Sequence, residues 1–475
     1  MISGYVEQPS PRAGQALTLR VSTDAPQFRV EIYRCGSGLS LRGRSGWLAG
    51  RAAPPHLPFQ DWGRPSTGLR GEALEPWPAY RLPVHADWAS GVYAALLIEG
   101  DGADADRTAP DPSTPDGRDG RALFVVRPRI PTARILYKLP VLTYQAYNLA
   151  GGKPYDDATA RGQWCFYNVP RTREVPIPFP LGVSLHRPGG GTGATPYDVF
   201  NVDPFDPTPR QTYVHWDGKF VAWMEDAGYQ ADFCTDVDLH REGVDLLAPY
   251  RLLVSVGHDE YWSDSMRSRV EGYADAGGNV AFFSANTCWW RVTVDDDVTY
   301  RRVHFWHDPE EPGEPENSLV GVSFRNGGER DRDDHPIRAG YQVQHAGHWL
   351  YAGTGVQDGD VFGAGLSEYL AGYECDGAGF DRADLDAGRH VFSIGNDGTP
   401  KDFTILGIAD CRASGWGLDN SAATMGMYAR AGSDGTVFTA ATTDWARVLT
   451  GGTSRVVEQI THNVLDRSGR PGARP

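Results

Sequence analysis

The sequence predicts a multidomain α/β plus β protein, with a β-sandwich over residues 1–130 and an α/β unit with β-rich additions over residues 131–475. Three observations predict this fold class. Apolar and polar residues alternate in the first part, strands alternate with helices in the second, and 475 residues are enough for two or three domains. The composition, 40% hydrophobic and 22% charged, is typical of globular proteins.

The N-terminal part carries the pattern of half-buried strands. The segments 16–21 and 28–33 alternate apolar with polar residues, which places one face of each strand on a core and the other in water. The segments 92–98 and 123–126 are continuously apolar and are predicted to be buried strands. Proline and glycine separate these segments. We therefore expect a small antiparallel β-sandwich.

Strands and helices alternate in the second part. We expect parallel strands joined by right-handed crossovers, in a sheet with both faces covered by helices. Gly228 is placed to end a helix over 220–227, and Ser263 to cap the start of the next helix, which ends at Gly277. A last helix is predicted over 456–465. The other predicted segments are strands 135–142, 231–234, 252–256 and 280–283, a Gly/Pro-rich stretch over 151–211 and a β-rich region over 318–410.

The charge balance excludes some classes of partner. Lys and Arg number 45 and Asp and Glu 61, so the net charge is −16. This excess of acid argues against binding to nucleic acid or to an anionic membrane. Apolar runs are too short to cross a bilayer, and the first residues show no secretory signal. Six cysteines without metal-site or Cys-x-x-Cys spacing indicate reduced thiols. We therefore expect a cytoplasmic protein whose partner is a small-molecule substrate.

Polar residues follow each predicted parallel strand. The segments after the strands are 143–148, 235–240, 257–262 and 284–290. Ligands of open parallel sheets bind beyond the carboxyl ends of the strands, so we expect these segments to meet at one rim. Together they offer phenols, carboxylates, an imidazole, an amide and a thiol.

The sequence Gly-His-Asp-Glu at 257–260 is the most informative of these segments. Glycine permits a tight turn, and capping by Ser263 places Glu260 near the positive end of a helix dipole, which favours the ionised carboxylate. Such a carboxylate can bind a hard metal or carry a proton. Alternatively, Asp259 or Glu260 only caps the helix and pairs with an arginine. His258 is a general base, a metal ligand or a buried, hydrogen-bonded histidine.

Three further residues each have two interpretations. Tyr144 and Tyr147 either line the core or a pocket, or provide a phenolate that binds ferric iron. Cys288 is either a small buried residue or a thiol nucleophile with His258 as its base.

The same residues carry a family resemblance. The chain resembles the large (beta) subunit of N,N-dimethylformamidase through Thr-Tyr-Gln-Ala-Tyr-Asn at 143–148, Gly-His-Asp-Glu-Tyr-Trp at 257–262, Phe-Ser-Ala-Asn at 283–286, Gly-Tyr-Glu at 372–374 and Thr-Thr-Asp-Trp at 442–445. The resemblance implies an Ig-like β-sandwich followed by a flavodoxin-like, glutamine-amidotransferase-like α/β domain. It further implies a hydrolase of the C–N bond of a small amide that works as a homo-oligomer, with a small second subunit in the prototype.

The resemblance also implies a ferric ion (Fe³⁺) held by two tyrosines and one glutamate. Glu260 matches the glutamate and Tyr147 the first tyrosine. The second tyrosine is expected directly after the Arg-Pro pair at 187–188, where this chain has Gly189. The residues that remain as candidates for the third ligand are His186, Tyr197 and Tyr167. The predicted metal ligands are Tyr147, Glu260 and His186.

The remaining matches suggest roles in catalysis. Iron would polarise the amide carbonyl and lower the pKa of a bound water. His258 would move protons, Glu374 would act as base or orienting group, and Asn286 would donate a hydrogen bond to the developing oxyanion.

Two alternatives remain open. One is a metal-independent enzyme that uses His258, Asp259 and Glu260 for acid–base chemistry, such as a cyclisation or rearrangement in biosynthesis. The other is a non-catalytic ligand-binding protein.

Overall fold

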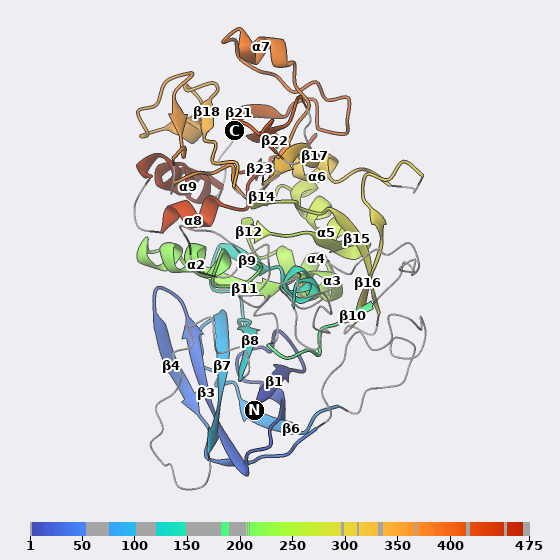
Figure 1. The fold of residues 1–475 in the computed structure, drawn as a ribbon, viewed down its shortest axis with the longest axis vertical. Helices are drawn as coiled ribbons and strands as arrows, with labels where there is room; N and C mark the ends of the chain where they lie inside the picture. The colour runs from blue at the N-terminus through green and yellow to red at the C-terminus, as the bar shows by residue number, and fades with distance from the viewer. Residues whose placement is uncertain are drawn as a thin grey trace, which may run out of the picture.

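The computed structural model shows a sheet-rich protein of the α/β plus β class, with several sheets and short helices (Figure 1). In Figure 1 the N-terminal strands lie at the bottom, the central parallel sheet lies above them, and further strands near the C-terminus lie at the top. The structure describes residues 2–53, 76–100, 120–148, 182–189, 206, 208, 210–295, 299–310, 313–330, 336–365, 368–414, 419–450 and 454–468.

Two antiparallel sheets form the N-terminal part, as the alternation predicts. In β2 the residues alternate between partly buried and fully buried. Leu19, Val30 and Phe124 belong to the core that the two sheets share. The first sheet has the order β1 (Ser3–Val6), β2 (Ala16–Ser22), β6 (Ala79–Pro83). The second has the order β4 (Leu39–Arg44), β3 (Gln27–Cys35), β7 (Gly91–Gly100), β8 (Arg121–Val126), and β5 (Leu48–Ala49) also pairs with β3.

The central sheet has nine strands among the described residues, in the order β11-β9-β12-β14-β23-β22-β21-β18-β19. The first five are parallel, and the four predicted parallel strands are among them. The others are antiparallel; β18, β19 and β21 lie in the predicted β-rich region, and β22 lies beyond its predicted end. The strands are β9 (Ile135–Leu139), β11 (Ala231–Thr235), β12 (Leu252–His258), β14 (Asn279–Ala285), β18 (Tyr341–Val343), β19 (Val361–Phe362), β21 (Thr404–Asp410), β22 (Ala422–Ala429) and β23 (Thr436–Thr439).

Helices cover both faces of the parallel strands (Figure 1). Helices α2 (Asp217–Asp226), α8 (Trp445–Leu449) and α9 (Arg455–Ser468) lie on the left in that view. On the right lie α3 (Asp236–Glu242), α4 (Val244–Leu247) and α5 (Asp264–Asp275). The predicted capping of α5 by Ser263 is confirmed, since the Ser263 hydroxyl accepts a hydrogen bond from the Met266 N–H. Gly277, with φ +93°, follows the end of this helix as predicted.

The predicted strand over 135–142 is too long. Strand β9 ends at Leu139, and α1 (Val141–Ala146) begins directly after Pro140. Proline has no backbone N–H to donate to a neighbouring strand, so it ends the ladder inside a sheet. The chain therefore turns at the carboxyl end of the strand, and the residue that follows α1 is Tyr147.

Two smaller sheets and three short helices complete the described fold. The sheet β17-β20 is the one that carries Glu374, as the first residue of β20. No described helix combines the length and the apolar character that crossing a membrane would need. The remaining elements are β10 (Gly182–Ser184), β13 (Tyr261–Ser263), β15 (Trp290–Asp295), β16 (Thr299–Phe305), β17 (Ser323–Glu329), β20 (Glu374–Gly377), α6 (Asn317–Val320), α7 (Arg382–Asp386) and the 3₁₀ turn η2 (Trp349–Tyr351).

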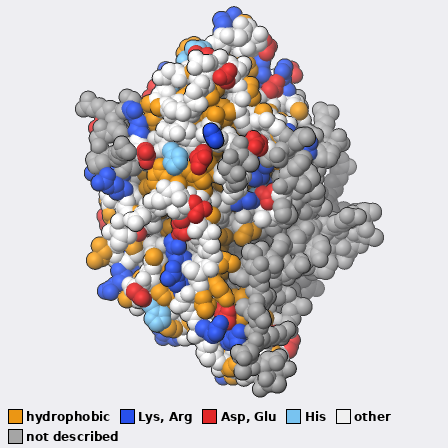
Figure 2. All heavy atoms as spheres, turned by 90° about the vertical axis from the view of Figure 1, so that its left-hand side faces the viewer, with side chains coloured by type: hydrophobic (Ala, Val, Ile, Leu, Met, Phe, Trp, Pro, Cys, Tyr) orange, Lys and Arg blue, Asp and Glu red, His pale blue; other side chains and the backbone are white. Residues whose placement is uncertain are grey.

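The N-terminal sheets pack directly against the central sheet. Val92 and Leu123 belong to the same apolar core as the parallel strands. Ion pairs join the two parts: Arg34 lies 2.6 Å from Glu225, and Arg127 lies 3.1 Å from Asp238. On the face shown in Figure 2, basic and acidic side chains are interspersed among hydrophobic ones, without a continuous basic field in the part that is described.

Candidate active site

Five of the predicted residues meet where the parallel strands end. Tyr147 follows α1, His258 is the last residue of β12, and Asn286 directly follows β14. Glu260 comes two residues after β12, and Glu374 is supplied by β20. All five side chains are buried. We call these residues the His258 cluster.

Glu260 joins a phenol to the imidazole. The Tyr147 hydroxyl donates to Glu260 Oε2 at 2.9 Å, and His258 Nε2 lies 3.5 Å from the same oxygen. The backbone N–H of Glu260 donates to the Thr143 hydroxyl at 3.0 Å, which anchors the residue to α1. The other carboxyl oxygen, Oε1, is buried and has no hydrogen-bond partner among the described residues. An unsatisfied buried oxygen is costly, so this atom is available to a ligand.

His258 contacts polar groups through both ring nitrogens. Nε2 lies 3.0 Å from Glu374 Oε2 and 3.2 Å from the Asn286 amide nitrogen. Nδ1 lies 2.8 Å from Gln211 Oε1. An imidazole between two carboxylates and an amide can hold a proton and pass it on.

Burial and charge shift the two central pKa values in this cluster. Burial raises the pKa of Glu260 to about 7, against the opposing effect of His258. Burial alone would lower the pKa of His258, but Glu374 and Glu260 raise it above the usual histidine value. The expectation that a helix dipole keeps Glu260 ionised is wrong. The three residues of β13 separate Glu260 from α5, and desolvation dominates.

The backbone brings His258 into place through Gly257. Gly257 has φ +72°, and a Cβ atom there would lie 2.5 Å from Trp216 Cβ. The Trp216 ring meets the His258 ring edge to face, with centroids 5.8 Å apart. Gly257 therefore permits the close approach to Trp216. It lies within β12 and pairs with Ser284, so the tight turn predicted at this glycine is not found there.

Asn286 is held in an uncommon conformation. Its φ is +51°, in the left-handed region that non-glycine residues seldom adopt. The Asp376 carboxylate accepts the backbone N–H groups of Asn286 at 2.8 Å and Thr287 at 3.3 Å. These bonds aim the Asn286 amide at His258.

Asp259, predicted as an acid–base group, does not join the cluster. Its Oδ2 lies 2.5 Å from Lys138 Nζ and accepts the Ser255 hydroxyl at 2.6 Å, while Oδ1 accepts the Trp262 indole N–H at 3.0 Å. Lys138 and Asp259 are fully buried. Asp259 is therefore the structural member of the predicted pair, although its partner is a lysine and not an arginine.

The predicted third metal ligand also lies elsewhere. His186 Nε2 is 3.0 Å from the Glu7 carbonyl oxygen, and its ring stacks on Tyr5 of the N-terminal sheets. Gly189 forms a bridge with Ala122 of β8. The other two candidates, Tyr167 and Tyr197, lie outside the described residues.

Three other residues that follow the parallel strands make no hydrogen bond to the cluster in the described part of the chain and have structural roles. The Tyr144 hydroxyl donates to Asp217 and not to the cluster. After β11, Asp236 accepts the Leu142 N–H at 2.8 Å. Cys288 is buried, and burial raises the pKa of its thiol well above the usual range. That shift opposes the thiolate which a cysteine nucleophile needs.

The donors of the cluster fit part of the predicted iron site. Among the described residues, no three His, Cys, Asp or Glu side chains are arranged to hold a metal. Tyr147 and Glu260 nevertheless lie side by side, and a phenol and a carboxylate are the oxygen donors that ferric iron accepts. The free Oε1 of Glu260 fits such a ligand role. The second tyrosine of the expected set is absent from the described part of this cluster.

Sequence reasoning missed three residues that contact the cluster, and a fourth, Tyr373, that contacts one of them, Gln211. Gln211 lies in the stretch that shows no periodic pattern, so no sequence signal marks it. Tyr373 and Asp376 flank Glu374, and the alternation of side chains along a strand places Glu374 and Asp376 on one face. Strand alternation would therefore have found Asp376. Trp216 precedes α2 and carries no motif.

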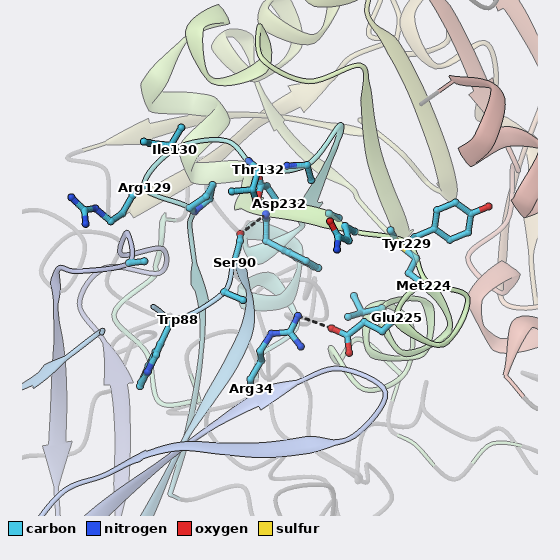
Figure 3. A pocket seen from close by; sticks show the side chains of 18 of the residues that line it. Arg34, Trp88, Ser90, Arg129, Ile130, Thr132, Met224, Glu225, Tyr229 and Asp232 are labelled. Carbon is cyan, nitrogen blue, oxygen red and sulfur yellow. Dashed lines mark hydrogen bonds and ion pairs between the residues drawn. The ribbon is translucent and has the colours of Figure 1, made fainter. Parts of the chain in front are cut away.

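A cavity of about 830 Å³ lies apart from this cluster, between the N-terminal sheets and the central sheet. Trp88, Met224 and Tyr229 line it, and the Arg34–Glu225 ion pair lies at its wall (Figure 3). Its lining includes no residue of the His258 cluster. This cavity belongs to the junction and not to the candidate site.

Comparison with known proteins identifies the family. Over 203 residues the chain is 28% identical to the N,N-dimethylformamidase beta subunit of Paracoccus aminophilus, a match that covers 36% of this chain and 25% of that protein. Over 119 residues it is 29% identical to the N,N-dimethylformamidase beta subunit of Alcaligenes sp., covering 24% of this chain and 15% of that one. These matches span a quarter or less of the relatives' length. Since residues 64–459, most of the chain, match the family described as N,N-dimethylformamidase beta subunit-like, C-terminal, the protein belongs to that family.

Proposed function

We propose that this protein hydrolyses the C–N bond of a small amide. The observation that carries the proposal is the His258 cluster, in which an imidazole lies within 3.5 Å of two buried carboxyl groups at the ends of parallel strands. The names of the two relatives support amide hydrolysis as the reaction class. Amide hydrolysis needs proton transfer to the leaving amine and stabilisation of an oxyanion, and the cluster offers groups for both.

The protein's own residues account for the proton movements. Glu374 accepts a proton from the attacking water, and His258 delivers the proton on Nε2 to the leaving nitrogen. The Asn286 amide donates a hydrogen bond to the carbonyl oxygen as negative charge develops on it. Burial excludes bulk water from these groups, which strengthens each electrostatic contact.

We further propose that Tyr147 and Glu260 hold a ferric ion. Such an ion, when bound, polarises a carbonyl oxygen and lowers the pKa of a bound water. The position of His186 against Glu7 speaks against His186 as the third ligand. The same position, together with Gly189, favours a second candidate function, in which His258 and Glu260 perform acid–base chemistry without metal.

Amine release from N,N-dimethylformamide and a panel of small formamides and acetamides tests the reaction. We expect release by the wild-type protein, near-stoichiometric iron by elemental analysis, and a visible phenolate-to-iron band that Tyr147→Phe removes. A colourless, metal-free and fully active protein would overturn the iron proposal in favour of the second candidate. Thermal stabilisation by amides without any product would instead indicate a binding protein.

The finer architecture remains part of the proposal. We assign residues 1–130 to an Ig-like domain and residues 131–475 to a flavodoxin-like, glutamine-amidotransferase-like domain in a cytoplasmic homo-oligomer. The two antiparallel N-terminal sheets and the parallel order of the central sheet support the domain types. The relatives are named beta subunits, which supports an assembly with a small second subunit. Light scattering of the purified chain measures whether it forms an oligomer by itself.

A further inference from the structure

We propose that Gln211 is a positioning residue, which keeps a proton on His258 Nδ1 so that Nε2 is the nitrogen that exchanges protons with the substrate. This inference rests on the proposed function, because it assigns the proton transfer to Nε2. It concerns a residue that the sequence does not mark.

The geometry around Gln211 points to this role. Its side chain is fully buried, and Oε1 lies 2.8 Å from His258 Nδ1. Its amide nitrogen donates to the Tyr373 hydroxyl at 3.2 Å. Because the amide nitrogen is engaged by Tyr373, the amide oxygen faces the imidazole and accepts the proton of Nδ1.

The opposite side of the imidazole is compatible with this tautomer. Nε2 lies 3.2 Å from the Asn286 amide nitrogen, which can donate to its lone pair. It also lies 3.0 Å from Glu374 Oε2 and 3.5 Å from Glu260 Oε2, which pair with Nε2 when the imidazole is protonated. An imidazolium donates from both nitrogens and needs an acceptor at each. Once Nε2 has given its proton away, the Nδ1–H bond to Gln211 remains, and Nε2 carries the lone pair.

The backbone of Gln211 is strained in a way that suits a fixed position. Its φ is +58°, in the left-handed region. Conformations of this kind cluster at functional sites, where the surrounding structure enforces them. The same segment supplies Trp216, whose ring meets the His258 ring at 80°. One stretch of chain therefore fixes both the plane of the imidazole and its tautomer.

Kinetics of two variants separates positioning from packing. Gln211→Leu removes the acceptor with little change in volume, and Gln211→Glu keeps an oxygen at the same place. On an amide that the wild type cleaves, we expect Gln211→Leu to lower kcat about 100-fold with KM within about threefold, and Gln211→Glu to stay within about tenfold of the wild-type kcat. Gln344→Leu is the matched control, since Gln344 is buried and accepts the Val391 N–H at 3.0 Å.

Three results would overturn the inference: an unchanged kcat in Gln211→Leu, an equal loss in both Gln211 variants, or a similar loss in Gln344→Leu. Neutron diffraction from wild-type crystals in D₂O supplies a readout that needs neither activity nor variants. We expect deuterium on His258 Nδ1, directed at Gln211, and its absence would refute the assignment. If the wild type cleaves no amide, the proposed function fails, while the neutron result still decides the tautomer.

Discussion

Two buried carboxyl groups beside α1, Asp217 and Glu260, differ in how completely their oxygens are satisfied. Asp217 accepts hydrogen bonds from Tyr137 at 2.6 Å and from Tyr144, one on each oxygen. Glu260 accepts one from Tyr147, and its Oε1 has no partner among the described residues. Burial raises the pKa of both carboxyl groups to about 7. A raised pKa therefore does not distinguish the two; the open oxygen and the adjacent imidazole do.

The comparison teaches that a functional carboxyl is recognised by the contacts it lacks. Both oxygens of Asp217 accept hydrogen bonds from tyrosines, and Asp259 has a lysine and two hydrogen-bond donors as partners, so both residues are structural. Glu260 stands next to Asp259 in the sequence, and the sequence alone left open which of the two only caps the helix. The predictions below test whether this division between structural and functional carboxyl groups holds.

Replacing Glu260 is expected to have the largest effect. In Glu260→Ala we expect amide turnover to fall by about 10³-fold or more, because a proton-holding group and predicted ligand is lost. Asp217→Asn serves as the control and is expected to keep turnover within about tenfold of the wild type. Amine release measured on folded protein decides the matter. An equal loss in both variants would erase the distinction between the two carboxyl groups.

The second largest effect is expected on stability, when the buried ion pair between Lys138 and Asp259 is broken. Lys138→Met leaves the Asp259 carboxylate buried without its cation, and the loss of one partner of such a pair costs about 3–5 kcal/mol. We expect the double variant Lys138→Met/Asp259→Leu to recover most of this free energy of unfolding. Urea denaturation measures both variants. If the double variant is as unstable as the single one, unpaired charge is not the cause.

The pH dependence of the free energy of unfolding tests the raised pKa of Asp217. Its pKa is about 7 in the folded protein against 3.8 for the ordinary side chain, so the folded state binds more protons between these values. The stability contributed by Asp217 is therefore present in full below about pH 4 and is lost as pH rises toward 7. We expect Asp217→Asn to be less stable than the wild type by about 1–3 kcal/mol at pH 5, and the difference to shrink by pH 8. A constant difference in urea denaturation would contradict the shift.

The smallest effects are expected for Tyr144, which lies in α1, and for Tyr147, which directly follows it. One substitution should affect mainly stability and the other mainly turnover. Tyr144→Phe removes one hydrogen bond to Asp217 and should lower the free energy of unfolding by about 1 kcal/mol with little change in turnover. Tyr147→Phe should lower turnover by about tenfold or more while stability changes little. Thermal unfolding and amine release are measured on both variants. A larger loss of turnover in Tyr144→Phe than in Tyr147→Phe would contradict this assignment of a structural and a functional tyrosine.

Local patterns predicted much of the central sheet. The apolar runs of β12 and β14, the cap at Ser263 and the glycine after α5 lie within one short stretch, and their signals depend only on neighbouring residues. Strand β23 was missed because it is four residues long and pairs in parallel with β14 from far along the chain. Such pairing leaves no local pattern.

For the site, the sequence by itself determined which chemical groups follow the parallel strands, because the carboxyl ends of these strands share one edge of the sheet. The sequence thereby predicted Tyr147, His258, Glu260 and Asn286 as candidate site residues. Only the tertiary structure decided that Asp259 is paired and Glu260 is open, since Lys138 lies 121 residues from Asp259 in the sequence. It also decided that Gln211 and not another residue contacts His258 Nδ1. Hydrogen bonds and ion pairs between distant segments depend on packing, which no local pattern encodes.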